Sequence, residues 1–443
     1  MLNIKGILKY VWCKGYFGVW YNDIYCMKTK NNGVWDVIVI GGGPAGMMAA
    51  GRAAQEGKSV LLLEKNQSLG KKLLITGGGR CNVTNNKQNV RMMATQYKGS
   101  DQFLMSAFAQ FDVSKTLAFF HRHGMKTKEE AEGRIFPASN TAQSVLDVLL
   151  NYMRAGEVTV HTHVEVVGFL RNQEEEVFVI QPKKGKALRA HTCIVATGGT
   201  SRPDTGSTGE GFAWLKALGH TITENNMALV PIAIKNGWVK RMAGITLRDI
   251  KLTVLQNGMR QFVQKGKLLF THVGISGPTV LNMSKDVGEL LSHGDVVIEL
   301  DLFPHYDAGT LRGRLQALLT DEHNKKLKNT LPAFMTAALV PELLALAGVD
   351  GETANHSVRH EDRLKLVTCM KAMPMHVKGL LGAHKAIVSD GGVALKEVDF
   401  KTMQSRVVPG LYLIGDVLNI SRPSGGYSLQ LCWTTGFVAG SHV

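Results

Sequence analysis

The sequence predicts an α/β protein whose main domain is interrupted by an antiparallel β domain and a small helical lobe. Three observations lead to this fold class. A β-branched run at residues 37–40 leads through three closely spaced glycines into a helix. Short apolar strands dominate residues 229–300, and helical runs dominate residues 308–370. A last strand at residues 411–414 returns the chain to the main domain.

The glycine-rich stretch after the first strand is the feature around which the chain is organised. Gly41, Gly43 and Gly46 stand at the spacing G-x-G-x-x-G, and Pro44 and Ala45 open the helix. The first glycine permits a tight turn, the second lets a diphosphate approach the backbone, and the third lets helix and strand pack closely. The helix N-terminus offers N–H groups and a partial positive charge to phosphates. The stretch therefore predicts a Rossmann-like dinucleotide site.

A glutamate at the end of the second strand supports this interpretation. Residues 59–63 form an apolar run, and Glu64 comes 23 positions after Gly41. A carboxylate at this distance is placed to accept hydrogen bonds from the two hydroxyls of a ribose. The alternative is an incidental glycine-rich turn beside an unrelated glutamate. The order strand, loop, helix, strand, glutamate favours the dinucleotide site.

A second glycine-rich segment, GKKLLITGGGRCNVTN at residues 70–85, carries further candidate binding residues. Gly79 is the last of three successive glycines that let a flat ring or another backbone come close. Lys71, Lys72 and Arg80 can neutralise phosphate, and Asn82 can hydrogen-bond a polar ring edge. Cys81 has no partner cysteine nearby in sequence, so packing or cofactor contact is favoured over a redox role.

Length and composition exclude several classes of protein. The 443 residues suffice for two or three domains, and 44% of them are hydrophobic, which allows large cores. Six scattered cysteines without a C-x-x-C pair argue against a disulfide scaffold, a zinc site and a dithiol active site. No metal is expected. No apolar run reaches the roughly 18 residues that a membrane-spanning helix needs. A reducing cytoplasm is the simplest location.

The chain is strongly basic, with a formal net charge of +15. This balance suits an anionic cofactor, an anionic substrate or a nucleic acid. The sequence shows no run of lysine and arginine with interleaved aromatic residues and no nucleic-acid-binding motif. A solvated basic surface is therefore favoured over a nucleic-acid partner, and a small molecule is the expected substrate.

The first 34 residues are not expected to belong to the folded domain. They mix aromatic residues with five lysines, show no clean period, and lack the apolar core and cleavage site of a signal peptide. We expect translation to begin at Met27, or residues 1–26 to be a dispensable appendage. The alternative is a short anchor on a membrane surface, which the aromatic residues and lysines permit.

The rest of the chain is divided by its hydrophobic patterns. We expect the main domain to cover 35–226 and 385–443, the inserted β domain 227–307 and 371–384, and the helical lobe 308–370.

Local patterns predict further elements within these parts. Within 101–155 the hydrophobic residues recur at helical spacing, and His121 and His123 lack the spacing of metal ligands. Residues 134–137 are expected to form a turn. Two prolines, Pro332 and Pro341, are expected to divide the run at 327–346 into two helices.

The motifs together resemble the BaiN/YhiN-type flavoproteins, NAD(P)/FAD-dependent oxidoreductases that include aminoacetone oxidase and a bile-acid 4,6-enoyl reductase. The resemblance runs along almost all of the chain from residue 35. It rests on GGGPAG, LLLEKN, the segment at 70–85, ATGG at 196–199, GISGP at 274–278, GLYLIGD at 410–416 and GGYSLQ at 425–430. Two departures are visible: Asp416 stands where the family often has glutamate, and Ser428 where it usually has asparagine.

The resemblance implies FAD in a glutathione-reductase-type Rossmann-like domain. It places the backbone of Val166 at the adenine and Asp416 near a ribityl hydroxyl, which is compatible with a helix N-cap. The helix expected at 429–439 would point its N-terminus at the pyrimidine carbonyl of the flavin. Further residues that the resemblance implies at the cofactor are Lys65, Thr197, Gly198, Gly415, Gly426, Tyr427, Ser428 and Leu429.

The expected chemistry is hydride transfer between FAD and a small organic substrate, either amine oxidation or NAD(P)H-linked reduction of an enone. No second G-x-G-x-x-G fingerprint is present, so NAD(P)H is expected only as a transient donor. We expect both inserted lobes to cover the flavin, so that NAD(P)H and substrate share one cleft. Tyr427, Arg80 and His272 are candidate acids or bases, each equally compatible with a structural role. The alternatives are a flavoprotein that acts on RNA and a flavin-binding sensor without turnover.

Overall fold

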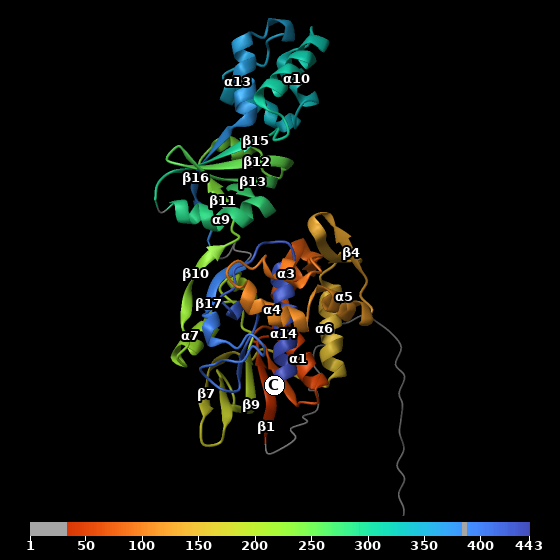
Figure 1. Cartoon of the computed structure of the whole chain (residues 1–443), viewed down its shortest axis with the longest axis vertical. Helices are drawn as coiled ribbons and strands as arrows, with labels where there is room; N and C mark the ends of the chain where they lie inside the picture. Colours follow the sequence, from red (N-terminus) through yellow and green to blue (C-terminus); the bar gives the residue numbers. More distant parts are fainter. Residues whose placement is uncertain (1–32, 292, 383–387) are drawn as a thin grey trace, which may run out of the picture.

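The computed structural model describes residues 33–291, 293–382 and 388–443. The appendage and the start site expected before residue 33 lie outside these residues. Figure 1 shows three parts along the longest axis: the main domain at one end, a β barrel in the middle and a group of helices at the other end. The predicted α/β class with an inserted β domain and a small helical lobe is confirmed. In the described part of the chain, no helix combines the length and the apolar character required to cross a bilayer.

The main domain is built on a seven-stranded sheet. Its strands run in the order β6 (Thr159–His161), β2 (Val60–Leu63), β1 (Val34–Ile40), β9 (Leu188–Val195), β8 (Val177–Pro182) and β7 (Val166–Asn172). The short strand β18 (Leu411–Leu413) also pairs with β9. The strands β6, β2, β1, β9 and β18 are parallel, so their carboxyl ends meet at one edge, whereas β7 and β8 form an antiparallel meander. The sheet is fully buried where β1 and β2 pair, as their continuous apolar runs require.

Two helices pack closely against each other on this sheet. Helix α1 (Pro44–Gln55) begins directly after the glycine loop, and the final helix α14 (Tyr427–His442) lies against it. A β-carbon at Gly436 would approach the carbonyl oxygen of Ala45 to 2.5 Å, so the glycine is required for this approach. Helix α6 (Gln143–Ala155) covers another side of α1. The last helix of the chain is thereby fixed beside the glycine loop.

A small antiparallel sheet lies outside this core. It contains β3 (Thr84–Asn85), β5 (Arg134–Pro137) and β4 (Thr127–Glu130). The turn expected at 134–137 is therefore wrong: these residues form β5, because they pair with strands on both sides. Helices α2 (Lys71–Ile75), α3 (Val90–Ala94), α4 (Asp101–Gln110) and α5 (Val113–Arg122) complete this part of the domain.

The inserted β domain closes into a barrel. Its order is β11 (Ile232–Ile234), β14 (Gly274–Ser276), β13 (Met259–Phe270), β12 (Thr246–Gln256), β15 (Val296–Asp301) and β16 (Met373–Leu380), which pairs with β11 again. All these pairs are antiparallel. Within the range expected to hold short strands, residues 259–270 form the single long strand β13. Beside the short helix α8 (Gly237–Arg241), the barrel carries α9 (Pro278–Leu291), a helix that the sequence reading missed.

The helical lobe follows β15 and contains α10 (Ala308–Asp321), α11 (Leu327–Thr330), α12 (Val340–Ala347) and α13 (His360–Lys371). The run at 327–346 divides into α11 and α12, as its two prolines predict. Figure 1 places α10 and α13 at the end of the molecule farthest from the main domain. The expectation that both lobes cover the flavin site is therefore wrong for the helical lobe, because the barrel separates it from the main domain.

A two-stranded ladder connects the barrel to the main domain. Strand β10 (Ile222–Ala228) leads into the barrel after helix α7 (Glu210–Ala217), and β17 (Val388–Val393) leads back out of it. The two strands pair antiparallel, with Ile222 opposite Val393 and Ala228 opposite Val388. Both passages of the chain between the domains therefore run side by side at the waist of the molecule (Figure 1).

Candidate functional site

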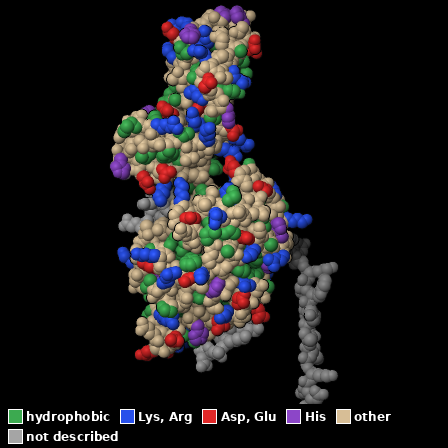
Figure 2. Space-filling model, in the orientation of Figure 1, with side chains coloured by type: hydrophobic (Ala, Val, Ile, Leu, Met, Phe, Trp, Pro, Cys, Tyr) green, Lys and Arg blue, Asp and Glu red, His purple; other side chains and the backbone are tan. Residues whose placement is uncertain are grey.

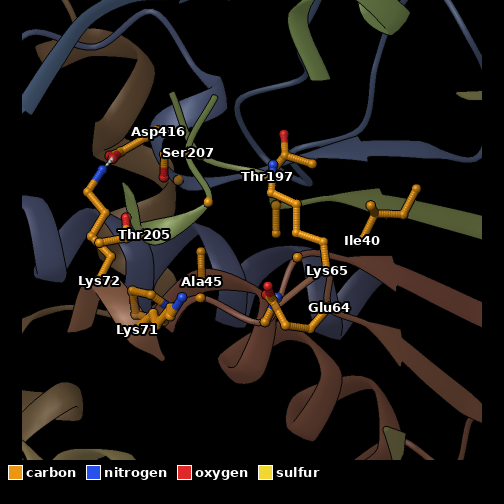
Figure 3. A pocket seen from close by; sticks show the side chains of 18 of the residues that line it. Ile40, Ala45, Glu64, Lys65, Lys71, Lys72, Thr197, Thr205, Ser207 and Asp416 are labelled. Atoms are coloured by element: carbon orange, nitrogen blue, oxygen red, sulfur yellow. Dashed lines mark hydrogen bonds and ion pairs between the residues drawn. The ribbon is translucent and has the colours of Figure 1, made fainter. Parts of the chain in front are cut away.

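An elongated pocket lies at the carboxyl edge of the parallel strands. It is lined by the ends of β1, β2, β9 and β18, by the loop before α1 and by the first turn of α14. Figure 3 shows Glu64 and Lys65 at one end, Lys72 and Asp416 at the other, and Ala45 between them. Ligands of open α/β sheets bind at this edge, where loops leave the strand ends.

The three glycines of the first loop have three distinct environments. Gly41 has a φ of +111°, and a β-carbon there would lie 2.4 Å from the carbonyl oxygen of Ala196. A β-carbon at Gly46 would lie 1.9 Å from the carbonyl oxygen of Gly41. By contrast, a β-carbon at Gly43 would meet no protein atom within 4 Å among the described residues, and Gly43 lines the pocket. Two glycines therefore serve packing, whereas Gly43 leaves space for a ligand at the backbone.

The start of α1 is suited to an anion. Gly43 is the N-cap residue, and no side chain caps the helix there. The partial positive charge of the helix N-terminus therefore faces the pocket without a competing side-chain acceptor. At the end of β9, the hydroxyl of Thr197 is buried and has no hydrogen-bond partner among the described residues. Thr197 lines the same pocket, and its buried hydroxyl lies against Gly211, where a β-carbon would clash with it.

Glu64 lies at the end of the pocket away from Asp416, where it holds the glycine-rich loop before α1 in place. One carboxylate oxygen accepts the N–H of Gly42 at 2.8 Å, and the other accepts the backbone and side-chain N–H groups of Asn66 at 2.8 and 2.7 Å. The residue is only 8% exposed. Each carboxylate oxygen has two lone pairs. Both lone pairs of Oε1 are occupied by Asn66, whereas Oε2 has one left, to which a ribose hydroxyl can donate.

Opposite charges meet at the Asp416 end of the pocket. The ammonium of Lys72 lies 3.1 Å from Asp416 Oδ2 and 2.7 Å from the hydroxyl of Ser201. The guanidinium of Arg422 contacts Asp416 Oδ1 and donates to Ser428 Oγ at 3.0 Å. Burial by itself raises the pKa of Asp416, but the cations of Arg422 and Lys72 outweigh burial and lower this pKa to about 2. The cluster thus holds an ionised carboxylate between two cations and has a net positive charge.

Most of the residues expected at the cofactor line this pocket. They are Gly41, Gly43, Pro44, Ala45, Glu64, Lys65, Lys71, Val166, Thr197, Gly198, Gly415, Asp416, Ser428 and Leu429. The other residues expected at the cofactor are described by the structure but do not line it: Gly46, Gly79, Arg80, Cys81, Asn82, Gly426 and Tyr427. His272, a candidate acid or base, does not line it either.

Arg80 is occupied by contacts outside the pocket. Its guanidinium donates to both carboxylate oxygens of Glu130 at 2.8 and 3.2 Å and lies 4.1 Å from the centre of the Phe136 ring. A bidentate pair stacked on an aromatic ring fixes a guanidinium in place. Arg80 therefore joins the glycine-rich segment to the β4–β5 hairpin in this structure.

The remaining candidates have mainly structural surroundings. Cys81 is fully buried, and burial raises the pKa of its thiol to about 12. Tyr427 is buried at the start of α14, and burial raises the pKa of its phenol to about 12, so it stays protonated at neutral pH. His272 is exposed on the barrel between β13 and β14. Asn82 has a buried side-chain oxygen without a partner among the described residues.

Several pocket residues were missed in the sequence. Among them are Asn66, Thr205, Ser207 and Cys432, which line the pocket, and Arg422, which contacts Asp416 and Ser428 beside it. Lys72 follows Lys71 in a segment already singled out, but only the turn of α2 directs it toward Asp416. Within the described residues, no group of three histidine, cysteine, aspartate or glutamate side chains could hold a metal ion.

Known proteins resemble the chain along nearly all its length. Residues 35–442 match the family described as "HI0933-like protein Rossmann domain". The chain is 32% identical over 406 residues to the 3-dehydro-bile acid delta(4,6)-reductase of Clostridium scindens, a match that covers 91% of this chain and 97% of the relative. It is 30% identical over 408 residues to the ribosomal RNA dihydrouridine synthase of Escherichia coli, covering 91% and 96%.

A solved structure shares the overall fold. The 3-ketosteroid delta1-dehydrogenase of Sterolibacterium denitrificans, solved with 1,4-androstadiene-3,17-dione, is similar with a TM-score of 0.53. The match covers 93% of this chain and 99% of the solved chain at 14% identity. At this identity the similarity concerns the fold alone.

Proposed function

Since the chain belongs to the HI0933-like Rossmann family of FAD-dependent oxidoreductases, we propose that it reduces a carbon–carbon double bond conjugated to a carbonyl group. FAD would bind in the elongated pocket and supply the hydride. The other sequence-based alternatives, amine oxidation and a sensor without turnover, receive no support from the relatives named above.

The residues of the pocket fit FAD. The open space at Gly43 and the uncapped start of α1 suit a diphosphate. Glu64 suits the adenosine ribose at one end. The Lys72–Asp416–Arg422 cluster and Ser428 offer donors and acceptors to the flavin half at the other end.

One observation carries the proposed reaction. The two full-length relatives have names that describe different substrates but the same chemical change. A bile acid with 4,6-unsaturation and a 3-oxo group has its double bonds conjugated to the ketone, and the uracil of uridine has its C5–C6 double bond conjugated to the C4 carbonyl. In uracil, hydride would add to the β-carbon C6 and a proton would reach C5. In the dienone, hydride would add to the β-carbon C5 or to the δ-carbon C7, and a proton would reach the neighbouring C4 or C6. In each case the carbonyl oxygen takes up negative charge between the two steps. The double bond is reduced by two electrons and two hydrogens in total.

The net positive charge at the Asp416 end supports this chemistry. Two cations and one carboxylate leave one positive charge at this end of the pocket. A fixed positive charge stabilises negative charge that develops nearby during hydride transfer. The chain supplies the charge through Lys72 and Arg422, which are held in place by Ser201 and Ser428.

A second candidate substrate is uridine in RNA. Two observations favour it: the full-length similarity to a ribosomal RNA dihydrouridine synthase and the formal net charge of +15. We propose NAD(P)H as the transient electron donor in either case. Since the barrel is the part of the insertion that lies next to the main domain, donor and substrate would both approach the flavin between the barrel and the main domain.

An anaerobic titration tests the proposed reaction. Purified protein is reduced with dithionite and mixed with a steroid 4,6-dien-3-one, a uridine-containing RNA or a primary amine. We expect the dienone or the RNA to restore the absorbance of oxidised flavin, and the amine to leave it bleached. The proposal is wrong if neither acceptor reoxidises the flavin while an amine reduces the oxidised protein.

A further inference from the structure

A second, basic pocket lies at the waist of the molecule. It has a volume of about 500 Å³ and is lined by residues of the main domain, of the connecting ladder and of the barrel. Lys98 comes from the loop before α4, Lys285 from the barrel helix α9, and Lys396 from the turn after β17. Figure 2 shows lysine and arginine side chains around this waist. Three ammonium groups from three separate segments are thus brought to one cavity.

The other lining groups are neutral hydrogen-bonding groups. Ser100, Ser421 and Thr223 contribute hydroxyls, and the side-chain amide of Asn419 donates to the hydroxyl of Thr223 at 3.1 Å. None of the described lining residues is an aspartate or a glutamate. Ammonium groups together with hydroxyl and amide donors form the donor set that binds phosphate oxygens.

The basic pocket shares a wall with the cofactor pocket. The loop after the 3-10 turn η9 (Gly415–Val417) forms this wall. Asn419 and Ser421 line the basic pocket, whereas the next residue, Arg422, contacts Asp416 and Ser428 on the cofactor side. An anionic group in the basic pocket would therefore lie across this loop from the Asp416 end of the cofactor pocket, the end that we assign to the flavin.

We propose that this basic pocket binds a phosphate group of a nucleotide ligand during the reaction. This inference rests on the proposed function, because it assumes that the ligand's other end reaches the flavin. The phosphate belongs either to the backbone of an RNA substrate or to NADPH as electron donor. The three lysines form the site, and Ser100, Ser421 and Asn419 add neutral donors.

The test replaces all three lysines in the full-length, FAD-loaded protein, as Lys98→Gln, Lys285→Gln and Lys396→Gln. A matched control carries Lys184→Gln, Lys186→Gln and Lys216→Gln, which make the same charge change at exposed positions elsewhere on the main domain. Binding of a short uridine-containing RNA, of NADPH and of a steroid carboxylate is measured by titration of the oxidised protein. The absorbance of bound FAD shows whether each variant is folded.

We expect the pocket variant to bind RNA or NADPH at least tenfold more weakly than both the natural protein and the control. For RNA, the plot of log affinity against log salt concentration also becomes less steep, by about 0.7 for each lost phosphate contact. Weakened RNA binding identifies a backbone phosphate, and weakened NADPH binding identifies the donor. Unchanged affinity for both, or weakening of the steroid carboxylate alone, overturns the proposal. These titrations measure binding without turnover. The phosphate site can therefore be refuted while the proposed reaction is confirmed, and the reaction can be refuted while the phosphate site is confirmed.

Discussion

The ammonium of Lys72 lies 3.1 Å from the carboxylate of Asp416, although the two residues are 344 positions apart in the chain. Lys72 belongs to a helix of the first half of the main domain, and Asp416 follows its last strand. Their contact joins the halves of the domain that precede and follow the inserted barrel in the chain, at the Asp416 end of the pocket. This relationship determines which cation should matter for cofactor binding.

Replacing Lys72 should weaken FAD binding more than replacing Arg80. Lys72→Met removes a pocket-lining cation and leaves Asp416 with Arg422 alone, so we expect a lower FAD content after purification. Arg80→Met removes a guanidinium that contacts Glu130 and Phe136 outside the pocket, so we expect FAD content near that of the natural protein. Flavin absorbance per protein measures both. The opposite order would place Arg80, and not Lys72, at the cofactor.

Gly43→Val should abolish FAD binding without unfolding the protein. The valine side chain would extend into the space that we assign to the diphosphate, while meeting no protein atom at its β-carbon among the described residues. Gly168→Val in β7 is the control, since it also has open space at the β-carbon and stands in a strand, where valine is favoured. Flavin content and circular dichroism check the result. A Gly43→Val protein with full FAD would refute this placement of the diphosphate.

Glu64→Ala should weaken FAD binding by about 1–3 kcal/mol, the cost of losing charge-assisted hydrogen bonds. Part of this loss is indirect: the backbone N–H groups of Gly42 and Asn66 both donate to the Glu64 carboxylate, so the loop that they belong to is held less firmly in the variant. Glu64→Gln keeps one acceptor oxygen, so its loss should be smaller. Titration of the apoprotein with FAD gives both affinities. If the natural protein and both variants bound FAD with equal affinity, Glu64 would not be the residue that contacts the ribose.

Asp416→Asn should destabilise the fold in a pH-dependent manner. The folded-state pKa of about 2 lies below the unfolded value of about 3.9. The carboxylate therefore stabilises the fold above about pH 4, by about 2–3 kcal/mol, and this contribution is lost as the pH falls toward 2. Urea unfolding should show a difference from the natural protein at neutral pH that shrinks at about pH 3.

The control for this prediction is Asp204→Asn, which removes an exposed ion pair with Arg202. An exposed pair of this kind is screened by water, so the control should change stability less than Asp416→Asn at neutral pH. A difference between Asp416→Asn and the natural protein that grows toward acid pH would contradict the ionised state assigned to Asp416.

The parts of the fold that were predictable depend on local sequence. The glycine loop, α1 and the two strands beside them lie within 30 residues, and their roles follow from backbone sterics at a few positions. Helix α9 was also visible in principle, because Val280, Met283 and Val287 recur at helical spacing and are buried. It was missed because the short strands around it dominated the pattern.

The parts that were not predictable depend on contacts between distant residues. Closure of the barrel needs Ile234 to pair with Val377, and no local pattern specifies this pairing. Arg80 has the sequence surroundings of a phosphate ligand, yet the distant Glu130 takes both of its outer nitrogens. Arg422 carries no motif signal, and only the fold of the loop after β18 brings it to Asp416.

The most direct test of the proposed reaction is the product of a single anaerobic turnover. Protein reduced by one equivalent of dithionite per bound FAD is mixed with a steroid 4,6-dien-3-one or with a uridine-containing RNA, and the products are analysed by mass spectrometry. We predict that one acceptor gains two hydrogens at a double bond conjugated to its carbonyl, with one product molecule formed for each FAD that is reoxidised. Reoxidation without such a product, or no reoxidation by either acceptor, would contradict the assignment of this protein as a reductase of conjugated double bonds.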